Sequence, residues 1–330
     1  MPSKTQKIYI YLLALLFAAV PFGLSGQGLP GFGGNITLTV TPEFPRANEE
    51  VTVSARGFSI DLDRAEVSWT LNGKLEKKAV GGTIFSFRTE SLGKTSALMV
   101  TVKSLSQGSF KETLTIRPAE VDVLWEALTY TPPFYKGKRM LSSSGTITVT
   151  AMPSFVVASG KTLDSAALVY SWEQDGKNLL SQSGFGKQSI VLSSPPLFQE
   201  SLVSVEVSSL DKSIRARRTI VLAPVEPKVV FYEKHPLKGI LYAHVVEKTF
   251  TLLKEEFVLR AEPFFFPKNI LKDDTSNFSW SVNSADALPQ KENELILRHE
   301  GDERGSSRVE LTVKNEEKLL QAVASVLIQY

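Results

Sequence analysis

The chain has 330 residues, of which 42% are hydrophobic and 22% are charged, and these globular proportions allow two or three domains. The formal net charge is +2, and without Lys4 and Lys7, which lie in an N-terminal segment that we expect to be removed, the 37 basic residues fall to 35, equal to the 35 acidic ones. This balance excludes a general attraction to nucleic acid or anionic membranes. The absence of cysteine excludes disulfides, thiolate metal sites and thiol nucleophiles.

The first 26 residues have the order of a secretory signal peptide. A polar, basic stretch precedes 13 unbroken apolar residues, Ile8 to Val20, and a proline and small residues follow. Because a membrane-spanning helix needs about 20 apolar residues, we expect residues 1–26 to be cleaved after export, with an uncleaved N-terminal anchor as the alternative. The glycines of residues 27–34 predict a flexible tether to the first domain.

One motif recurs three times in the rest of the chain. Trp69, Trp172 and Trp280 each follow an apolar residue by two positions, and an Asn or Asp stands three positions after each of them. The tryptophans are 103 and 108 residues apart, which predicts three tandem units. Since apolar and polar residues alternate around each tryptophan, we expect the three indoles to be structural core residues of three separate domains.

The segments before and after each tryptophan also alternate with a period of two. Residues 51–55, 147–151 and 257–261 precede the three tryptophans at similar distances, and further alternating segments follow each of them. Asn72-Gly73 and Asp175-Gly176 favour tight hairpins. Outside the leader, no helical periodicity extends beyond about two turns.

We therefore predict an all-β chain of three tandem immunoglobulin-like β-sandwiches after an N-terminal signal segment. The expected domain ranges are 35–118, 119–224 and 225–330. Prolines at the two boundaries predict short, stiff connections, because proline fixes its backbone φ angle. The domains should consequently form a semi-rigid row.

The tryptophan motif, with its following Asn-Gly or Asp-Gly, resembles immunoglobulin-like domains, especially the PKD-type modules of bacterial surface proteins. The resemblance covers about residues 35–330, but the PKD pattern continues as Trp-Asp-Phe-Gly-Asp-Gly, whereas Thr-Leu-Asn-Gly follows Trp69 and Glu-Gln-Asp-Gly follows Trp172. Residues 170–177 and 183–189 are also similar to uncharacterised exported proteins of small-genome bacteria, some encoded near type IV pilus components. That resemblance implies an envelope or pilus-associated accessory protein.

No set of residues predicts chemistry. The sequence has no nucleophile elbow, no phosphate-binding loop with the required spacing, and no His or acidic spacing typical of a metal site. We expect a protein that is not an enzyme, has no catalytic residues, and uses no cofactor and no metal.

The main candidate for an interaction surface is Phe264-Phe265-Phe266, which stands between Pro263 and Pro267. Side chains alternate between the two faces of a strand, so three consecutive phenylalanines cannot share one buried face. They either pack at the end of the third domain or against the second, or they form an exposed patch that binds a partner.

These observations predict a non-enzymatic exported protein of the periplasm or cell surface. Its expected role is structural or adhesive, or that of a pilus-associated accessory, and its expected partners are other envelope or surface proteins, including pilus components. We expect no nucleic acid partner, and membrane contact only through an uncleaved leader. The alternative is a ligand- or glycan-binding module, which would need Phe264, Phe265 and Phe266 exposed in a groove.

Overall fold

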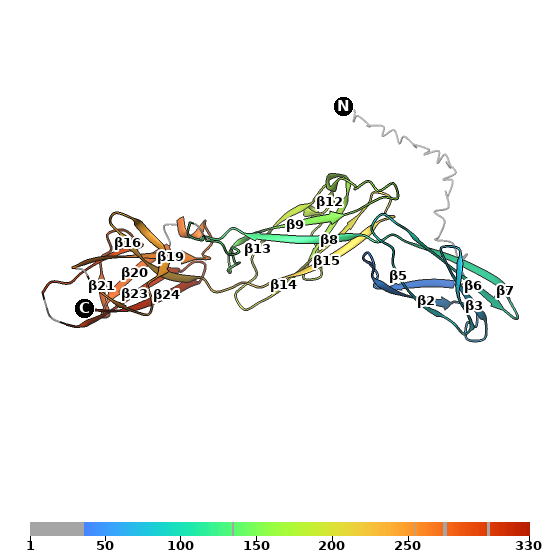
Figure 1. The fold of residues 1–330 in the computed structure, drawn as a ribbon, viewed down its shortest axis with the longest axis horizontal. Coiled ribbons are helices and arrows are strands. Elements are labelled where there is room, and N and C mark those ends of the chain that lie inside the picture. The colour runs from blue at the N-terminus through green and yellow to red at the C-terminus, as the bar shows by residue number, and fades with distance from the viewer. Residues whose placement is uncertain (1–35, 134, 254, 273–275, 302–303) are drawn as a thin grey trace, which may run out of the picture.

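The computed structural model describes residues 36–330 except 134, 254, 273–275 and 302–303. The expected signal peptide and tether lie outside these residues. The described chain forms three β-sandwiches in a row, in chain order from one end to the other (Figure 1). Apart from three short 3₁₀ helices, its regular elements are strands. The prediction of an all-β fold is therefore confirmed.

The first sandwich contains two antiparallel sheets with strand orders β1-β2-β5 and β4-β3-β6-β7. Its strands are β1 (Ile36–Thr41), β2 (Glu50–Gly57), β3 (Glu66–Leu71), β4 (Lys74–Val80), β5 (Ile84–Arg88), β6 (Ser96–Ser104) and β7 (Gly108–Ile116). If these strands are lettered A, B, C, C′, E, F and G, the sheets read A-B-E and C′-C-F-G. That is the arrangement of an immunoglobulin-like sandwich.

The second sandwich repeats this order, with sheets β13-β9-β8 and β11-β10-β14-β15, and β12 pairs with β10. Its elements are β8 (Glu120–Ala127), β9 (Thr146–Ser154), η1 (Ser165–Ala167), β10 (Val169–Gln174), β11 (Lys177–Asn178), η2 (Leu180–Gln182), β12 (Gly184–Phe185), β13 (Ser189–Ser193), β14 (Ser201–Ser208) and β15 (Arg215–Leu222). An unusually long segment, residues 128–145, joins β8 to β9. We call it the connecting segment.

The third sandwich has the same core order, with sheets β17-β16-β19-β22 and β18-β24-β23-β20-β21. Its elements are β16 (Lys228–His235), β17 (Gly239–Val245), β18 (Thr249–Thr251), β19 (Glu256–Phe264), η3 (Ile270–Lys272), β20 (Ser276–Val282), β21 (Ala285–Ala287), β22 (Glu294–Arg298), β23 (Ser306–Asn315) and β24 (Leu320–Gln329). Here β18 pairs in parallel with the last strand, β24. The prediction of three immunoglobulin-like sandwiches is thus confirmed.

The three tryptophans occupy equivalent places in the three sandwiches. Trp69, Trp172 and Trp280 lie on the C strands β3, β10 and β20, and each is buried in a separate hydrophobic core. Each indole N–H donates to a backbone carbonyl in the chain between the C′ and E strands. The accepting carbonyls belong to Gly82, Lys187 and Glu292, at 2.7, 2.8 and 2.8 Å.

The Asn or Asp after each tryptophan also has the same role in all three sandwiches. Asn72, Asp175 and Asn283 adopt φ angles of 50°, 50° and 51°, which Asn and Asp tolerate better than most residues. Each backbone N–H donates to a carbonyl at the start of strand F, and each side-chain Oδ1 accepts from the backbone N–H of that same residue. These residues of strand F are Ala97, Leu202 and Arg308, and the distances lie between 2.7 and 2.9 Å.

Within the part of the chain that the structure describes, no helix has the length and apolar character needed to cross a membrane.

Candidate site at the junction of the second and third sandwiches

The connecting segment reaches from the second sandwich to the third and pairs with its backbone. The amide of Tyr130 donates to the carbonyl of Phe266 at 2.7 Å, and the amide of Phe265 donates back to the carbonyl of Tyr130 at 2.8 Å. A third bond runs from the amide of Lys268 to the carbonyl of Leu128 at 3.2 Å. Two stretches more than 130 positions apart therefore form a short ladder between the sandwiches.

The phenylalanine run lies inside this junction and is buried. Phe264, Phe265 and Phe266 are 5%, 6% and 1% exposed. Phe266 belongs to the core of the third sandwich, whereas Phe264 and Phe265 form a separate cluster with Tyr232, against which Met140 of the connecting segment packs. The positive φ angle of Phe265, 66°, marks the change in chain direction within the run.

Further contacts from the connecting segment cover the same cluster. The ring of Tyr135 meets those of Phe264 and Phe265 edge-on, with centroids 5.6 and 6.0 Å apart. The buried hydroxyl of Ser142 donates to the carbonyl of Phe265 at 2.6 Å. The sequence left open an exposed patch at residues 264–266, and that alternative is wrong. The connecting segment of the second domain packs on these rings, so they cannot form an exposed surface for a glycan.

A buried carboxylate beside this cluster receives donors from both sandwiches. Glu262, on β19, is fully buried. The Tyr130 hydroxyl, from the connecting segment, donates to its Oε2, while Tyr242 Oη and Arg260 Nε donate to its Oε1 at 3.1 and 3.0 Å. A charge removed from water needs such donors, because an unpaired buried carboxylate costs several kcal/mol.

Arg260 extends this network to a second carboxylate. Its Nη1 donates to Glu294 Oε1 and to Asn293 Oδ1, each at 2.9 Å. Lys234 Nζ donates to Glu294 Oε2 at 2.7 Å. Two carboxylates, one guanidinium and one ammonium thus balance in charge across β16, β19 and β22.

Three groups that form hydrogen bonds in the network, Glu294, Tyr130 and Tyr242, have shifted pKa values. Burial raises the pKa of Glu294, but the hydrogen bonds from Lys234 and Arg260 outweigh it and hold the pKa below the ordinary value. Burial and then the neighbouring Glu262 raise the pKa of Tyr130 above its ordinary value, and that of Tyr242 to about 12. The two phenols therefore remain neutral donors at neutral pH.

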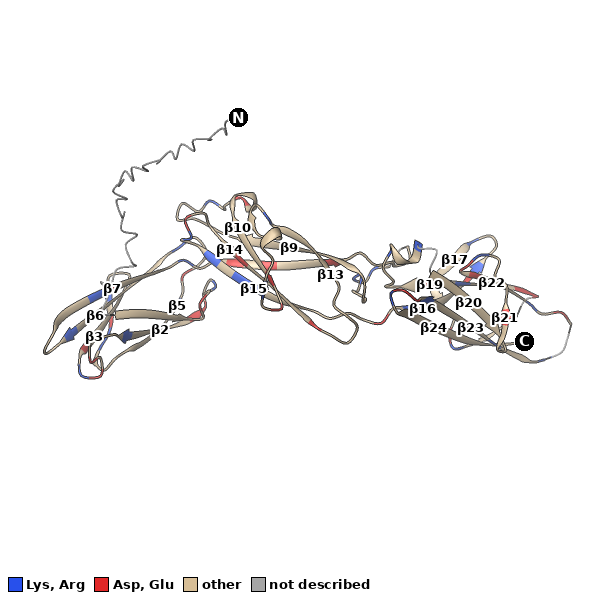
Figure 2. Ribbon diagram, turned by 180° about the vertical axis from the view of Figure 1, so that it is seen from behind, with Lys and Arg blue, Asp and Glu red and all other residues tan. Residues whose placement is uncertain are grey.

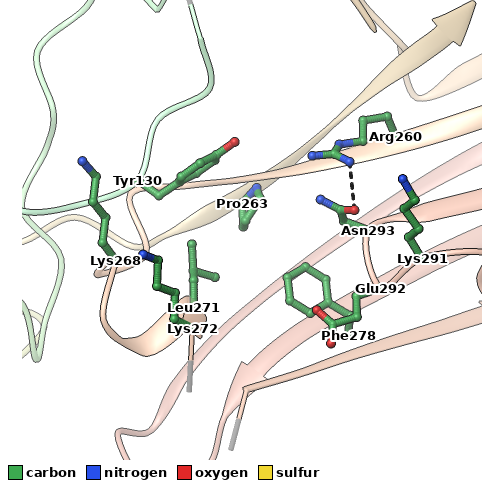
Figure 3. A pocket seen from close by; sticks show the side chains of 10 residues that line it. All are labelled: Tyr130, Arg260, Pro263, Lys268, Leu271, Lys272, Phe278, Lys291, Glu292 and Asn293. Atoms are coloured by element: carbon green, nitrogen blue, oxygen red, sulfur yellow. Dashed lines mark hydrogen bonds between the residues drawn. The ribbon is translucent and has the colours of Figure 1, made fainter. Parts of the chain in front are cut away.

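A groove of about 760 Å³ opens next to the network, as Figure 3 shows. Tyr130 of the connecting segment lies on one side, and the other lining residues come from the third sandwich. The apolar part of the wall includes Pro263, Leu271 and Phe278, and the charged or polar part consists of Arg260, Lys268, Lys272, Lys291, Glu292 and Asn293. Arg260 forms ion pairs with Glu262 and Glu294. Among the described residues, no carboxylate lies within ion-pair distance of Lys268, Lys272 or Lys291.

The groove offers apolar contact and ammonium groups to a ligand. Among the residues that the structure describes, no Ser, Thr, Cys or His lines it, so none of these lining residues matches a nucleophile with an adjacent base. Within the described ranges, no cluster of three or more His, Asp or Glu side chains could hold a metal ion.

Sequence reasoning did not identify Tyr130, Arg260, Glu262 or Glu294. Alternation along β19 puts Phe257, Leu259 and Ala261 toward the core, so Arg260 and Glu262 fall on the opposite face, where charged residues are normally solvated. Tyr130 of the connecting segment and Tyr242 of β17 contact Glu262 on that face, and no local pattern predicts these contacts. The sequence signals were the neighbouring phenylalanine run between two prolines and the length of the segment between β8 and β9.

The junction between the first and second sandwiches differs. Arg117 Nη1 donates to Ser213 Oγ at 3.0 Å, and Arg215 lies 4.0 Å from Glu43 and 5.0 Å from the centre of the Phe44 ring. Figure 2 shows the basic start of β15 beside this junction. These contacts are exposed. Gly93 also lies against Val156 and Val157, but no backbone–backbone hydrogen bond joins these two sandwiches among the described residues.

No protein-family model matches the chain, and no curated protein matches it. The solved structures similar to it include three N-terminal domains of the bacteriophage RB49 highly immunogenic outer capsid protein (12% identity; 89% of this chain and 98% of that chain; TM-score 0.27). A second is the Clostridium thermocellum CbhA fibronectin(III)-like modules (8% identity; 57% of this chain and 94% of that chain; TM-score 0.28). A third is the central fibronectin-III array of RIM-binding protein (10% identity; 89% of this chain and 95% of that chain; TM-score 0.30). At such TM-scores these likenesses decide nothing about function, and the fold assignment rests on the strand order described above.

Proposed function

We propose that the chain is a non-enzymatic, exported structural protein of the cell surface, which presents its second and third sandwiches as one stiff unit. The observation that carries this proposal is the backbone ladder between residues 128–130 and 265–268, together with the buried rings and carboxylate beside it. Domains that merely follow each other along a chain need no such junction, since interdomain motion is the default.

Several features support a spacer or docking role over an enzymatic one. Each sandwich exposes sheet edges and end loops, which are the surfaces that such domains use for binding. The leader supports export, and the sequence resemblance makes envelope assemblies, with type IV pilus components first among them, the partners to test. A stiff pair of sandwiches would hold a partner bound to the third sandwich at a fixed distance from the second.

The test compares a C-terminally tagged wild type with a Tyr130→Phe/Ser142→Ala variant by cross-linking in cells and mass spectrometry. We expect the wild type to capture envelope proteins, including pilins or secretion components, and the variant to capture them less efficiently at equal abundance. Ser279→Ala, an exposed change on β20, is the matched control. A wild-type catch of only the protein itself and wall material would overturn the accessory role. An unchanged catch by the variant would show that the accessory role does not depend on the side-chain hydrogen bonds of Tyr130 and Ser142.

A second candidate function, binding of a small anionic ligand, is favoured by the lysines over the apolar wall of the groove. The probe is a naphthalene carboxylate titrated into the full chain by calorimetry. Binding should weaken in Lys268→Gln/Lys291→Gln and not in Lys111→Gln, an exposed lysine of β7. Absence of binding to the wild type would exclude this function for aromatic carboxylates.

A further inference from the structure

The last strand of the third sandwich, β24, has an open edge along most of its length. On the side away from β23, the short strand β18 pairs in parallel with Leu327, Ile328 and Gln329. Among the described residues, no strand pairs on that side with the preceding part of β24, residues 320–326. This part of the sheet edge can therefore accept a further strand.

The bonds to β18 show which backbone groups of β24 point toward the open side. The Leu327 N–H donates to the carbonyl of Lys248 at 2.9 Å. Backbone groups alternate in direction along a strand, so the N–H and C=O groups of Val323 and Ser325 point the same way as those of Leu327. No described residue forms a hydrogen bond with these groups on that side, so they are available to another strand.

A groove of about 640 Å³ lies along this edge. One wall is β24 from Val323 to Leu327, and the other consists of residues 229–231 of β16 and parts of 245–249. The two walls belong to opposite sheets of the sandwich, with β16 beside β24 (Figure 1). Val323 and Ser325 are exposed, so an extended chain can reach their backbone.

The absence of charge distinguishes β24 from the last strands of the other two sandwiches. No charged residue occurs in β24, whereas β7 carries Lys111 and Glu112, and β15 carries three arginines. Charged side chains on an edge strand oppose pairing with a further strand. The open edge of β24 has no such protection.

Two cations stand beside this uncharged edge. Lys248 and Arg308 line the groove, and no Asp or Glu is among the described residues that do so. No carboxylate of the described chain lies within ion-pair distance of either cation. Complementarity of charge therefore favours an occupant that carries carboxylates.

We propose that the edge of β24 binds an extended acidic peptide segment of a partner protein, which adds a strand in line with β18. Main-chain hydrogen bonds to Val323 and Ser325 would hold the segment, and its carboxylates would meet Lys248 and Arg308. Residues 320–326 offer an edge of roughly 20 Å, at about 3.3 Å per residue. This inference rests on the proposed docking role and names the surface and the chemistry of the partner.

The experiment selects a random-peptide phage library on the purified full chain and, in parallel, on Ser325→Pro. Proline removes an N–H that points away from β23, where edge strands tolerate it. We expect the wild type to enrich peptides that contain Asp or Glu and few prolines. Because a main-chain bond is lost and the ring obstructs pairing, Ser325→Pro should bind these peptides about tenfold more weakly.

A charge reversal gives a second test that does not alter the backbone. Lys248→Glu/Arg308→Glu, at two exposed side chains, should change the selected peptides from acidic to basic. Lys111→Glu, at an exposed lysine of β7, is the control and should leave the selection unchanged. In the wild type, a selected peptide should slow amide hydrogen exchange at Val323 and Ser325.

Three results would overturn the proposal. The first is equal or absent enrichment on the wild type and Ser325→Pro, and the second is continued selection of acidic peptides by the charge-reversed variant. The third is slow exchange at Val323 and Ser325 without peptide: if dilution abolishes it, a second copy occupies the edge, and if it persists, a segment of this chain does. Because purified protein is used, these failures leave the cellular test of the accessory role unaffected.

Discussion

At the scale of single residues, the junction depends on the carboxylate of Glu262. It is fully buried, and one of its three donors, Tyr130, comes from a different sandwich than the other two. A hydrogen bond to a buried charged group contributes about 1.5–3 kcal/mol, more than a bond between neutral groups. The phenol of Tyr130 therefore links the stability of the third sandwich to the position of the second.

Replacing Tyr130 by phenylalanine should show this link. We expect Tyr130→Phe to lower the free energy of unfolding by about 2 kcal/mol, because Glu262 loses one donor while the ring is kept. Urea denaturation measures the change. Tyr135→Phe is the control, since this tyrosine lies on the same segment and its hydroxyl has no hydrogen bond to any described residue. Equal losses in the two variants would contradict the role given to Glu262.

The buried tyrosines also predict a loss of stability in alkali. Burial raises the pKa of Tyr170 from its ordinary value of 10 to about 12, while an unfolded tyrosine ionises at its ordinary pKa. The folded state thus retains a proton that the unfolded chain loses, so this contribution is fully present below pH 10 and is lost as the pH rises toward about 12. The expected slope is about 1.4 kcal/mol per pH unit for one tyrosine.

The measurement is urea unfolding of wild type and Tyr170→Phe across this pH range. Comparison with the variant removes the contribution of lysines, which titrate in the same range in both proteins. The wild type should lose stability more steeply than the variant. Parallel curves would mean that the Tyr170 hydroxyl, which donates to the carbonyl of Ser165 at 2.8 Å, does not resist ionisation.

At the scale of elements, alternation of apolar residues was enough to predict the strands and the buried tryptophans. The Asn-Gly and Asp-Gly pairs were also read correctly as turns, since β3–β4 and β10–β11 are hairpins. What the pattern could not predict is the second bond of each turn residue, from its side chain to the start of strand F. That contact joins positions about 25 residues apart, as in Asn72 and Ala97, and exists only once the sheet has formed.

The turn residues give a prediction with a control taken from the chain itself. Asn72→Ala should lower the free energy of unfolding by about 2 kcal/mol, because Ala97 N–H loses its acceptor and alanine tolerates a φ of 50° poorly. Asn72→Asp should cost much less, since Asp175 makes the equivalent contact in the second sandwich. Chemical denaturation measures both variants, and an equal loss in both would show that the side-chain bond contributes little.

The connecting segment marks the limit of sequence reasoning at this scale. Loops longer than about 12–15 residues are uncommon in compact domains and often have a function, so the length of residues 128–145 was a usable signal. Its partners, however, lie on β19 and just after it, and no periodicity connects such distant positions. The burial of Glu262, which Tyr130 of this segment contacts, could not be predicted from its own strand.

At the scale of the whole molecule, the two junctions are built differently although the sequence made them look alike. Because prolines stand near both boundaries, the sequence predicted short connections of equal stiffness at the two junctions. In the structure the second junction has backbone bonds, buried rings and a buried carboxylate. The first has the close approach of Gly93 to Val156 and Val157 and the exposed contacts of Arg117 and Arg215, with no backbone–backbone hydrogen bond among the described residues. Exposed ion pairs contribute about 0–1 kcal/mol each and restrain motion little.

This difference predicts unequal mobility along the row. Spin labels at Thr148→Cys and Ser279→Cys, exposed on β9 and β20, report on the second and third sandwiches. Labels at Thr39→Cys, exposed on β1, and Thr148→Cys report on the first and second. Pulsed dipolar spectroscopy should give a narrow distance distribution for the first pair and a broader one for the second pair.

Adding Tyr130→Phe/Ser142→Ala to the Thr148/Ser279 label pair decides what causes the narrow distribution. If the side-chain hydrogen bonds of Tyr130 and Ser142 hold the sandwiches together, the distribution should broaden while both sandwiches stay folded by circular dichroism. If it stays narrow, the backbone ladder and the packing of Phe264 and Phe265 suffice without these two bonds. A broad Thr148–Ser279 distance distribution in the wild type would show that the second and third sandwiches do not form a stiff unit, and it would contradict the proposed spacer role.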